Sequence, residues 1–152
     1  GEVIEDRITT YKVSADVKNI SLSSDMAPGI PELVLFDKDA VKQILNNFLS
    51  NAIKFTPVGG SINVKAFTEG TSLRVEIRDT GIGISGQSLS SLFQTYSQVS
   101  LSSAGEAEKG TRGTGLGLSI AKGIAEAHGG TVGAVSKEGA GSTFFFTIPI
   151  DA

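Results

Sequence analysis

The chain has 152 residues, of which 39% are hydrophobic and 19% are charged, and its formal net charge is −3. This length predicts a single domain with a real core, and no apolar run approaches the roughly 18 residues that a membrane span needs. We expect no nucleic-acid surface, because no basic stripe with aromatic side chains is present, and the absence of cysteine excludes disulfides and thiolate sites.

The first part of the chain predicts two helices with strands between them. Apolar residues recur at helical spacing over 4–11, which predicts a short amphipathic helix. Alternation at 20–22 predicts a strand, which prolines and a glycine separate from a second apolar run at 33–36. Asp37 is then a suitable N-cap for a helix that runs to about Phe55.

The remainder predicts two hairpins and two further helices. Apolar and polar residues alternate over 62–77, which predicts a β-hairpin with one buried face. A helix around 88–93, a polar segment, a helix from about 116 to 128 and a last hairpin over 131–150 follow. Mixed strands backed by helices predict an α/β fold of two layers.

The predicted long helix carries two asparagines and a lysine on one stripe. Gln43, Asn47, Asn51 and Lys54 fall within an arc of about 80°, and apolar residues fill the opposite side. Asparagine is a poor helix former in the interior of a helix, so two of them one turn apart need a reason. Their amide oxygens suit Mg²⁺ next to phosphates, whose charge Lys54 can neutralise. A solvated polar face is the alternative.

The segment RVEIRDTGIGIS at 74–85 places a carboxylate at the end of a strand. Gly81 and Gly83 follow Asp79 and allow the backbone to approach a flat ligand closely. A purine offers an exocyclic amine, for which Asp79 is a natural acceptor, and Ile82 and Ile84 can supply apolar walls. A plain Asp-Thr-Gly turn is the alternative.

Four glycines, at 110, 113, 115 and 117, precede the predicted helix at 116–128. Glycine is costly where a helix nucleates. Here it leaves backbone N–H groups open at the positive end of the helix, where phosphate oxygens bind well. A flexible loop with one glycine as a cap is the alternative, and neither the P-loop nor the dinucleotide template fits.

The polar segment at 99–112 has the composition of a mobile lid. Such a lid closes over a nucleotide and excludes water. Lys109 and Arg112 are candidates to touch the terminal phosphate, with a solvated charge as the alternative for each.

Five motifs occur in a fixed order: NxxxNAxKFT at 47–56, DTGIGI at 79–84, SLFQTYSQ at 91–98, GTGLGLSIAK at 113–122 and GAGSTFFFTIP at 139–149. They resemble the N box, first glycine box, F box, second glycine box and last glycine motif of sensor histidine kinases, and the resemblance covers nearly the whole chain. It implies the Bergerat ATP-binding fold of gyrases, chaperones and histidine kinases. That fold is a two-layer α/β sandwich, with a mixed, mostly antiparallel sheet packed against about three helices and a lid at about 94–114.

The resemblance also assigns roles to residues. Asn51 would ligate Mg²⁺, Asp79 would bind the adenine amine of ATP, Thr143 would sit near the adenine, and Asn47 and Lys54 would serve the phosphates. The expected catalytic residues are Asn47, Lys54 and Arg112. The expected nucleotide site comprises Asn47, Asn51, Lys54, Asp79, Gly81, Gly83, Ile84, Tyr96, Arg112, Gly113, Thr114, Gly115, Leu116, Gly117, Leu118 and Thr143.

The branch of this superfamily decides the expected chemistry. Hydrolytic relatives place a glutamate one helical turn before the metal asparagine, where this chain has Asn47, and an amide cannot act as a general base. The resemblance therefore implies transfer of the γ-phosphoryl group to a histidine of a separate dimerisation domain, with a response regulator receiver domain downstream. The single histidine of the chain, His128, is expected to cap a helix C-terminus instead.

Three other functions stay open at this point. They are a nucleotide-binding regulatory module without phosphotransfer, a serine kinase of the anti-sigma type, and an interaction domain that has lost nucleotide binding. We expect a cytoplasmic location and no direct membrane contact from residues 1–152, and membrane anchoring of the full-length protein is left open.

Overall fold

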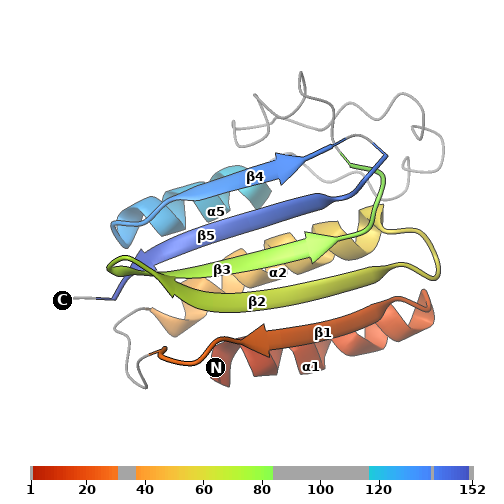
Figure 1. Ribbon diagram of the computed structural model, residues 1–152, viewed down its shortest axis with the longest axis horizontal. Helices are drawn as coiled ribbons and strands as arrows, with labels where there is room; N and C mark the ends of the chain where they lie inside the picture. The colour runs from red at the N-terminus through yellow and green to blue at the C-terminus, as the bar shows by residue number, and fades with distance from the viewer. Residues whose placement is uncertain (1, 31–36, 84–116, 138, 151–152) are drawn as a thin grey trace.

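The computed structural model describes residues 2–30, 37–83, 117–137 and 139–150 (Figure 1). The elements in chain order are α1 (Glu2–Val17), β1 (Ser21–Met26), α2 (Lys38–Phe55), β2 (Ser61–Glu69), β3 (Ser72–Asp79), α5 (Gly117–Ala127), β4 (Val132–Ser136) and β5 (Ser142–Pro149). They confirm the three predicted helices that fall on described residues, the strand at 20–22 and both hairpins. The predicted strand at 33–36, helix at 88–93 and lid at 94–114 lie outside the described residues.

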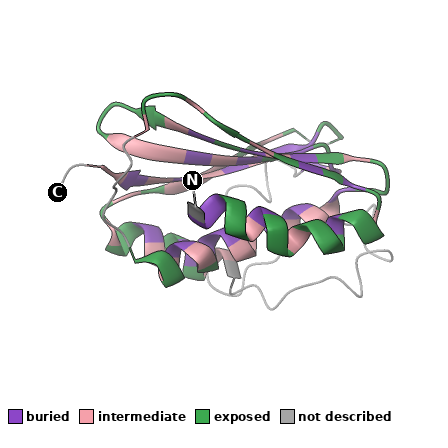
Figure 2. Cartoon of the chain, turned by 90° about the horizontal axis from the view of Figure 1, so that it is seen from below, coloured by how far each residue is buried: buried purple, intermediate pink, exposed green. Residues whose placement is uncertain are grey.

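The described strands form one sheet in the order β1-β2-β3-β5-β4. β1 pairs with β2 in parallel, and the other three pairings are antiparallel. Figure 2 shows the described helices on one face of this sheet, so the described part of the chain has two layers. The predicted α/β sandwich with a mixed, mostly antiparallel sheet is confirmed.

The core lies between the sheet and the helices, and α2 runs across its centre. The ring of Phe48 packs at 5.5 Å from the ring of Phe144 and at 6.2 Å from that of Phe146, both on β5. Tilted aromatic pairs at such distances add to the gain from burial. The apolar side of α2 is buried as predicted: Val41, Ile44, Leu45, Phe48, Leu49 and Ala52.

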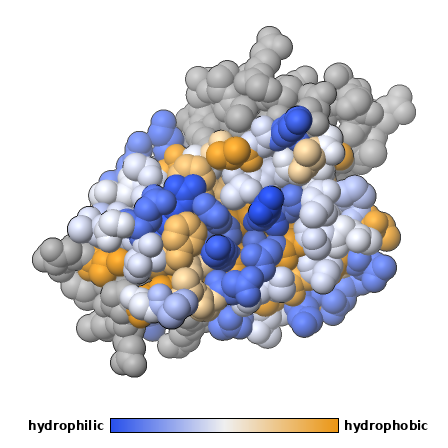
Figure 3. Space-filling model, in the orientation of Figure 1, coloured by the Kyte–Doolittle hydropathy of each residue, from blue (hydrophilic) through white to orange (hydrophobic). Residues whose placement is uncertain are grey.

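The opposite face of the sheet carries charged and aromatic side chains in close contact (Figure 3). The guanidinium of Arg74 lies 3.8 Å from the centre of the Phe145 ring and donates a 2.7 Å hydrogen bond to Glu76. The ammonium of Lys65 lies 5.5 Å from the centre of the Phe67 ring. Basic side chains therefore cover aromatic surface that the described helices leave uncovered.

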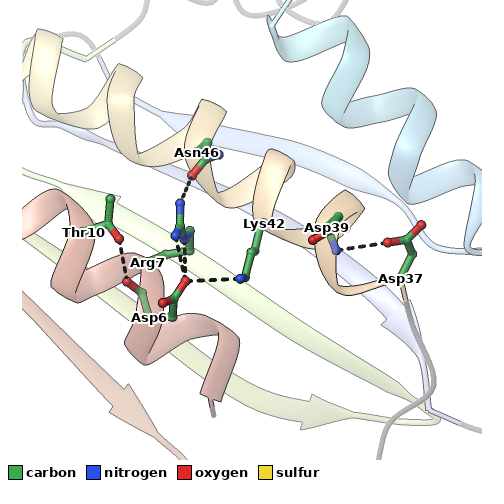
Figure 4. Close-up of polar contacts among 7 residues, drawn as sticks. All are labelled: Asp6, Arg7, Thr10, Asp37, Asp39, Lys42 and Asn46. Atoms are coloured by element: carbon green, nitrogen blue, oxygen red, sulfur yellow. Dashed lines mark hydrogen bonds and ion pairs between the residues drawn. The ribbon is translucent and has the colours of Figure 1, made fainter.

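Polar side chains join α1 to α2 (Figure 4). Arg7 donates a 3.0 Å hydrogen bond to the side chain of Asn46, and Asp6 forms a 3.5 Å ion pair with Lys42. The hydrogen bond from Arg7 to Asp6 lowers the pKa of the Asp6 carboxyl. α1 runs to Val17, well beyond the predicted 4–11. The prediction stopped short because Val13 and Val17 are exposed and interrupt the apolar pattern.

The N-terminus of α2 is capped as predicted. Asp37 accepts hydrogen bonds from the N–H groups of Asp39 at 3.0 Å and Ala40 at 3.2 Å, which satisfies donors that have no partner within the helix (Figure 4). None of the helices in the described part of the chain is long and apolar enough to cross a membrane.

Candidate functional site

Asp79 is a buried carboxylate at the end of β3. Its side chain is 6% exposed and accepts a 2.8 Å hydrogen bond from the N–H of Gly81. Burial raises the pKa of Asp79 above the usual range of an aspartate, and hydrogen bonds from the N–H groups of Gly81 and Ser142 oppose that rise. The backbone thus fixes the carboxylate where it can accept further hydrogen bonds with little competition from water.

The C-terminal end of α2 touches the turn that follows Asp79. The carbonyl of Phe55 accepts a 3.3 Å hydrogen bond from the N–H of Ile82. A Cβ on Gly81 would lie 2.4 Å from the same carbonyl, so this contact requires glycine. Gly83 is buried and adopts a φ of +75°, which also favours glycine. The first glycine motif is therefore shaped to fit the end of α2.

The last glycine motif meets the same turn from the other side. Gly141 has a φ of +90°, and a Cβ there would lie 2.2 Å from the carbonyl oxygen of Asp79. The N–H of Gly139 donates a 2.6 Å hydrogen bond to the carbonyl of Ile82. The end of α2, the end of β3 and the start of β5 therefore meet near Asp79, at one end of the strands (Figure 1).

The predicted amide stripe lies on the side of α2 away from its apolar residues. Asn47, Asn51 and Lys54 are half-buried, and Gln43 is exposed. Phe48 holds this orientation, because its ring is only 1% exposed and packs on β5. Two amides and one cation are thus presented on the helix whose end contacts the Asp79 turn.

α5 runs antiparallel to α2 and ends at the start of α2. The N–H of Asp37 donates a 3.1 Å hydrogen bond to Nε2 of His128, and Nδ1 of His128 donates to the carbonyl of Ile124 at 2.9 Å. The 11 residues of α5 extend about 16 Å. Because α5 is shorter than α2, its start lies beside the middle of α2 (Figure 1).

The predicted site residues divide into those that the structure brings together and those that it does not describe. Asp79, Gly81 and Gly83 lie at the end of α2, as above, and Leu118 is half-buried against the core at the start of α5. The predicted residues outside the described part are Ile84, Tyr96, Arg112, Gly113, Thr114, Gly115 and Leu116.

Thr143 is not brought to the Asp79 side of the sheet. Asp79 pairs with Ser142 across β3 and β5, both are buried, and Thr143 pairs with the exposed Arg78 on the opposite face. Ser142 donates its N–H to Asp79, and its hydroxyl lies 2.7 Å from that of Ser136 on β4. Sequence reasoning missed Ser142, which counting back in steps of two from the inward-facing Phe144 would have identified.

The chemistry of this site fits a magnesium nucleotide. Asp79 offers an acceptor for an amine, Asn47 and Asn51 offer amide oxygens of the kind Mg²⁺ accepts, and Lys54 offers a positive charge for phosphate. Among the described residues no group of three His, Cys, Asp or Glu side chains could hold a metal ion. An amide oxygen of α2 would be one ligand of such a metal, beside water and phosphate oxygens.

Comparison with known proteins identifies the family of the chain. Residues 36–152 match the family model described as "Histidine kinase-, DNA gyrase B-, and HSP90-like ATPase". The chain is 39% identical over 149 residues to the histidine protein kinase DivJ of Caulobacter vibrioides, covering 98% of this chain and 24% of that protein. It is 38% identical over 152 residues to the sensor histidine kinase GacS of Pseudomonas protegens, covering 97% of this chain and 16% of that protein. The chain thus spans a quarter or less of these two relatives.

Solved structures give the same result. The fold matches full-length ShkA in complex with AMPPNP with a TM-score of 0.84 and 28% identity, over 99% of this chain and 30% of that one. It matches the nucleotide-free catalytic domain of histidine kinase ThkA with a TM-score of 0.80 and 28% identity, over 98% of this chain and 91% of that one. The chain therefore belongs to the histidine kinase-, DNA gyrase B- and HSP90-like ATPase family, as a catalytic ATP-binding domain of the histidine kinase type.

Proposed function

We propose that this domain binds MgATP and transfers the γ-phosphoryl group to a histidine on a separate dimerisation domain, as the kinase module of a two-component signalling protein. One observation carries the proposal: the buried carboxylate of Asp79, the last turn of α2 and the last glycine motif are joined by hydrogen bonds of backbone N–H groups at one end of the central strand. The turn that follows β3, where Asp79 is proposed to bind the adenine, is thereby held at a fixed place relative to α2, which carries the proposed phosphate contacts.

The described residues have distinct roles in this proposal. Asp79 accepts a hydrogen bond from the adenine amine, and its burial strengthens that bond. Asn51 ligates Mg²⁺, and Asn47 and Lys54 contact the phosphates. Ser142 takes the position beside the adenine that the sequence assigned to Thr143, because it shares the inward face with Asp79.

The remaining predicted contacts stay part of the proposal. The start of α5 and the glycines before it, at 113–117, hold the phosphate tail through backbone N–H groups. Arg112 contacts the terminal phosphate, Ile84 and Tyr96 contact the nucleotide, and the segment 94–114 closes over it as a lid.

The site orients the reactants and does not supply a base. Asn47 occupies the position one turn before Asn51, and an amide cannot take a proton from water. An imidazole nitrogen of the acceptor histidine attacks the γ-phosphorus, the bond to the bridging oxygen breaks, and ADP leaves. Mg²⁺ neutralises charge on the phosphates when it is bound, and Lys54 adds a second positive charge.

His128 does not serve as the acceptor in this proposal. Both of its ring nitrogens are engaged, Nε2 by the N–H of Asp37 and Nδ1 by the carbonyl of Ile124. It is the single histidine of the chain, so the acceptor has to come from another domain. The curated relatives are several times longer than this chain and have room for one.

The partners and location follow the same reasoning. ThkA, with a TM-score of 0.76 and 26% identity to this chain, was also solved in complex with the response regulator protein TrrA. We propose a receiver domain as the downstream partner of this chain, and the cytoplasm as the compartment where both meet ATP.

The test is phosphotransfer in trans. The domain is incubated with ATP labelled in the γ-phosphate and with a histidine-bearing dimerisation domain of a relative such as DivJ. We expect label on the second domain that is stable in base and labile in acid, and none with the Asp79→Ala variant. Binding of ADP without any transfer to the parent protein's own histidine would favour a nucleotide-binding regulatory module.

A further inference from the structure

Lys18 follows α1 and reaches across to the end of α2. Its ammonium donates hydrogen bonds to the carbonyl of Ile53 at 2.8 Å and to the carbonyl of Lys54 at 3.1 Å. The last four carbonyls of a helix have no partner within it, and a cation there also interacts favourably with the helix dipole. Lys18 therefore provides a C-terminal cap for α2 from the residue that follows α1.

The three carbonyls at the end of α2 all have partners from outside the helix. Lys18 binds those of Ile53 and Lys54, and the N–H of Ile82 binds the next one, that of Phe55. The last turn of α2 is thus held on one side by α1 and on the other by the turn that follows Asp79.

The backbone fixes where the Lys18 side chain begins. Asn19 adopts a φ of +56°, and the N–H of Ile20 bonds the carbonyl of Ala15 at 2.8 Å, which ends α1 in a Schellman-type turn. The carbonyl of Asn19 in turn accepts a 3.1 Å hydrogen bond from the N–H of Gly59, just after α2. Backbone contacts therefore hold the end of α1 beside the end of α2, independently of the contacts of the Lys18 ammonium.

We propose that Lys18 is a positioning residue of the nucleotide site, which sets the last turn of α2 relative to the Asp79 turn by binding the carbonyls of Ile53 and Lys54. The proposal rests on the proposed function, because it concerns the same site. The N–H of Ile82 bonds the Phe55 carbonyl, and the N–H of the preceding residue, Gly81, bonds the carboxylate of Asp79, so a displaced helix end displaces the turn that holds the carboxylate. A shift of the same turn moves Lys54 and Asn51.

The test compares four forms of the domain: wild type, Lys18→Met, Lys18→Arg and Lys12→Met. Met keeps the apolar stem and removes the donor, Arg keeps the charge with a different shape, and Lys12 is an exposed lysine on the same helix. ADP binding with Mg²⁺ is followed by calorimetry, which separates the fraction of competent protein from the affinity of that fraction. The ThkA catalytic domain was solved on its own, so an isolated domain is a suitable sample.

We expect Lys18→Met to weaken ADP binding about tenfold in the folded fraction, because displaced contacts cost affinity steeply. Lys18→Arg should bind better than Lys18→Met, and Lys12→Met should match wild type. The backbone amide signals of Gly81 and Ile82 should shift in both Lys18 variants, which loss of stability alone would not cause. If Lys18→Met does not fold, ADP affinity and the amide signals of Gly81 and Ile82 are measured on Lys18→Arg instead.

Two results would overturn the inference in different ways. If wild type binds ADP while the Lys18 variants bind equally well, with Gly81 and Ile82 unshifted, then Lys18 does not position the site and the proposed function stands. If folded wild type does not bind ADP, the proposed function fails and the role of Lys18 fails with it.

Discussion

The carbonyl of Phe55 accepts a hydrogen bond from the N–H of Ile82, and this 3.3 Å contact joins the two halves of the site. Phe55 is the last residue of α2, which bears Asn47, Asn51 and Lys54, and Ile82 lies three residues after the buried Asp79. The contact is between backbones, so it depends on how closely the two segments approach. Glycine at 81 makes that approach sterically possible, because a Cβ there would meet the carbonyl of Phe55.

Replacing Gly141 by alanine should destabilise the domain by about 3 kcal/mol. The residue has a φ of +90°, and the new Cβ would lie 2.2 Å from the carbonyl oxygen of Asp79. Gly139→Ala is the matched control, because it has a φ of +82° with nothing near its Cβ; it should cost about 1 kcal/mol. Urea unfolding measures both, and equal losses would show that the contact with Asp79 is unimportant.

Nucleotide affinity should fall as the pH is lowered through the pKa of Asp79. Burial raises this pKa above 3.8, so the loss should begin at a higher pH than an ordinary aspartate would give. An ionised carboxylate is the stronger acceptor for an amine, which is why protonation weakens binding. ADP titrations at a series of pH values check this, and an affinity that is constant down to the ordinary aspartate range would contradict it.

The same pKa shift has the opposite effect on stability. Because the folded-state pKa of Asp79 is raised, its contribution to stability is fully present below the unfolded pKa and is lost as the pH rises through the folded value. Asp79→Asn removes the buried charge, so the variant should gain stability relative to wild type at neutral pH, and this gain should shrink as the pH falls. Urea unfolding of both proteins at two pH values measures this gain in stability, and a gain that grows at low pH would contradict the raised pKa of Asp79.

His128→Ala should lower stability and leave phosphotransfer to a separate domain intact. The substitution removes the acceptor for the N–H of Asp37 and the donor to Ile124, at an expected cost of about 1 kcal/mol. Thermal unfolding and the transfer assay check the two parts. A folded variant that no longer transfers phosphate would mean that His128 takes part in the reaction.

Asn51→Ala should remove the gain in ADP affinity that Mg²⁺ gives, a loss of about tenfold or more. Gln43→Ala is the control, since this exposed residue lies on the same stripe two turns earlier and should leave the gain unchanged. Titrations with and without Mg²⁺ measure it. If Mg²⁺ helps Asn51→Ala as much as wild type, Asn51 is not the metal ligand.

Local sequence signals predicted the elements that carry the site. α2 has a clear N-cap in Asp37 and an apolar side with helical period, so its start could be predicted closely. β3 alternates between apolar and polar residues up to Asp79, so its end could be predicted closely as well. The second half of α1 could not be predicted, because Val13 and Val17 are exposed and contribute nothing to an amphipathic pattern.

The sequence did not show which residues of β5 face the helices. Three consecutive phenylalanines, at 144–146, hide the two-residue period of the strand, because Phe145 faces outward and packs under Arg74. The sequence therefore did not distinguish Thr143 from Ser142. The contacts of Lys18 and the bond from Ile82 to Phe55 join segments 27 or more residues apart, and such contacts follow only from the docked arrangement of the helices and the sheet.

The most direct measurement is calorimetric titration of this domain with ADP, with and without Mg²⁺, beside the Asp79→Ala variant. We expect binding to wild type that Mg²⁺ strengthens, and no detectable binding to a variant that remains folded. Equal ADP affinity in wild type and Asp79→Ala, or no binding by folded wild type, would contradict the assignment of this site.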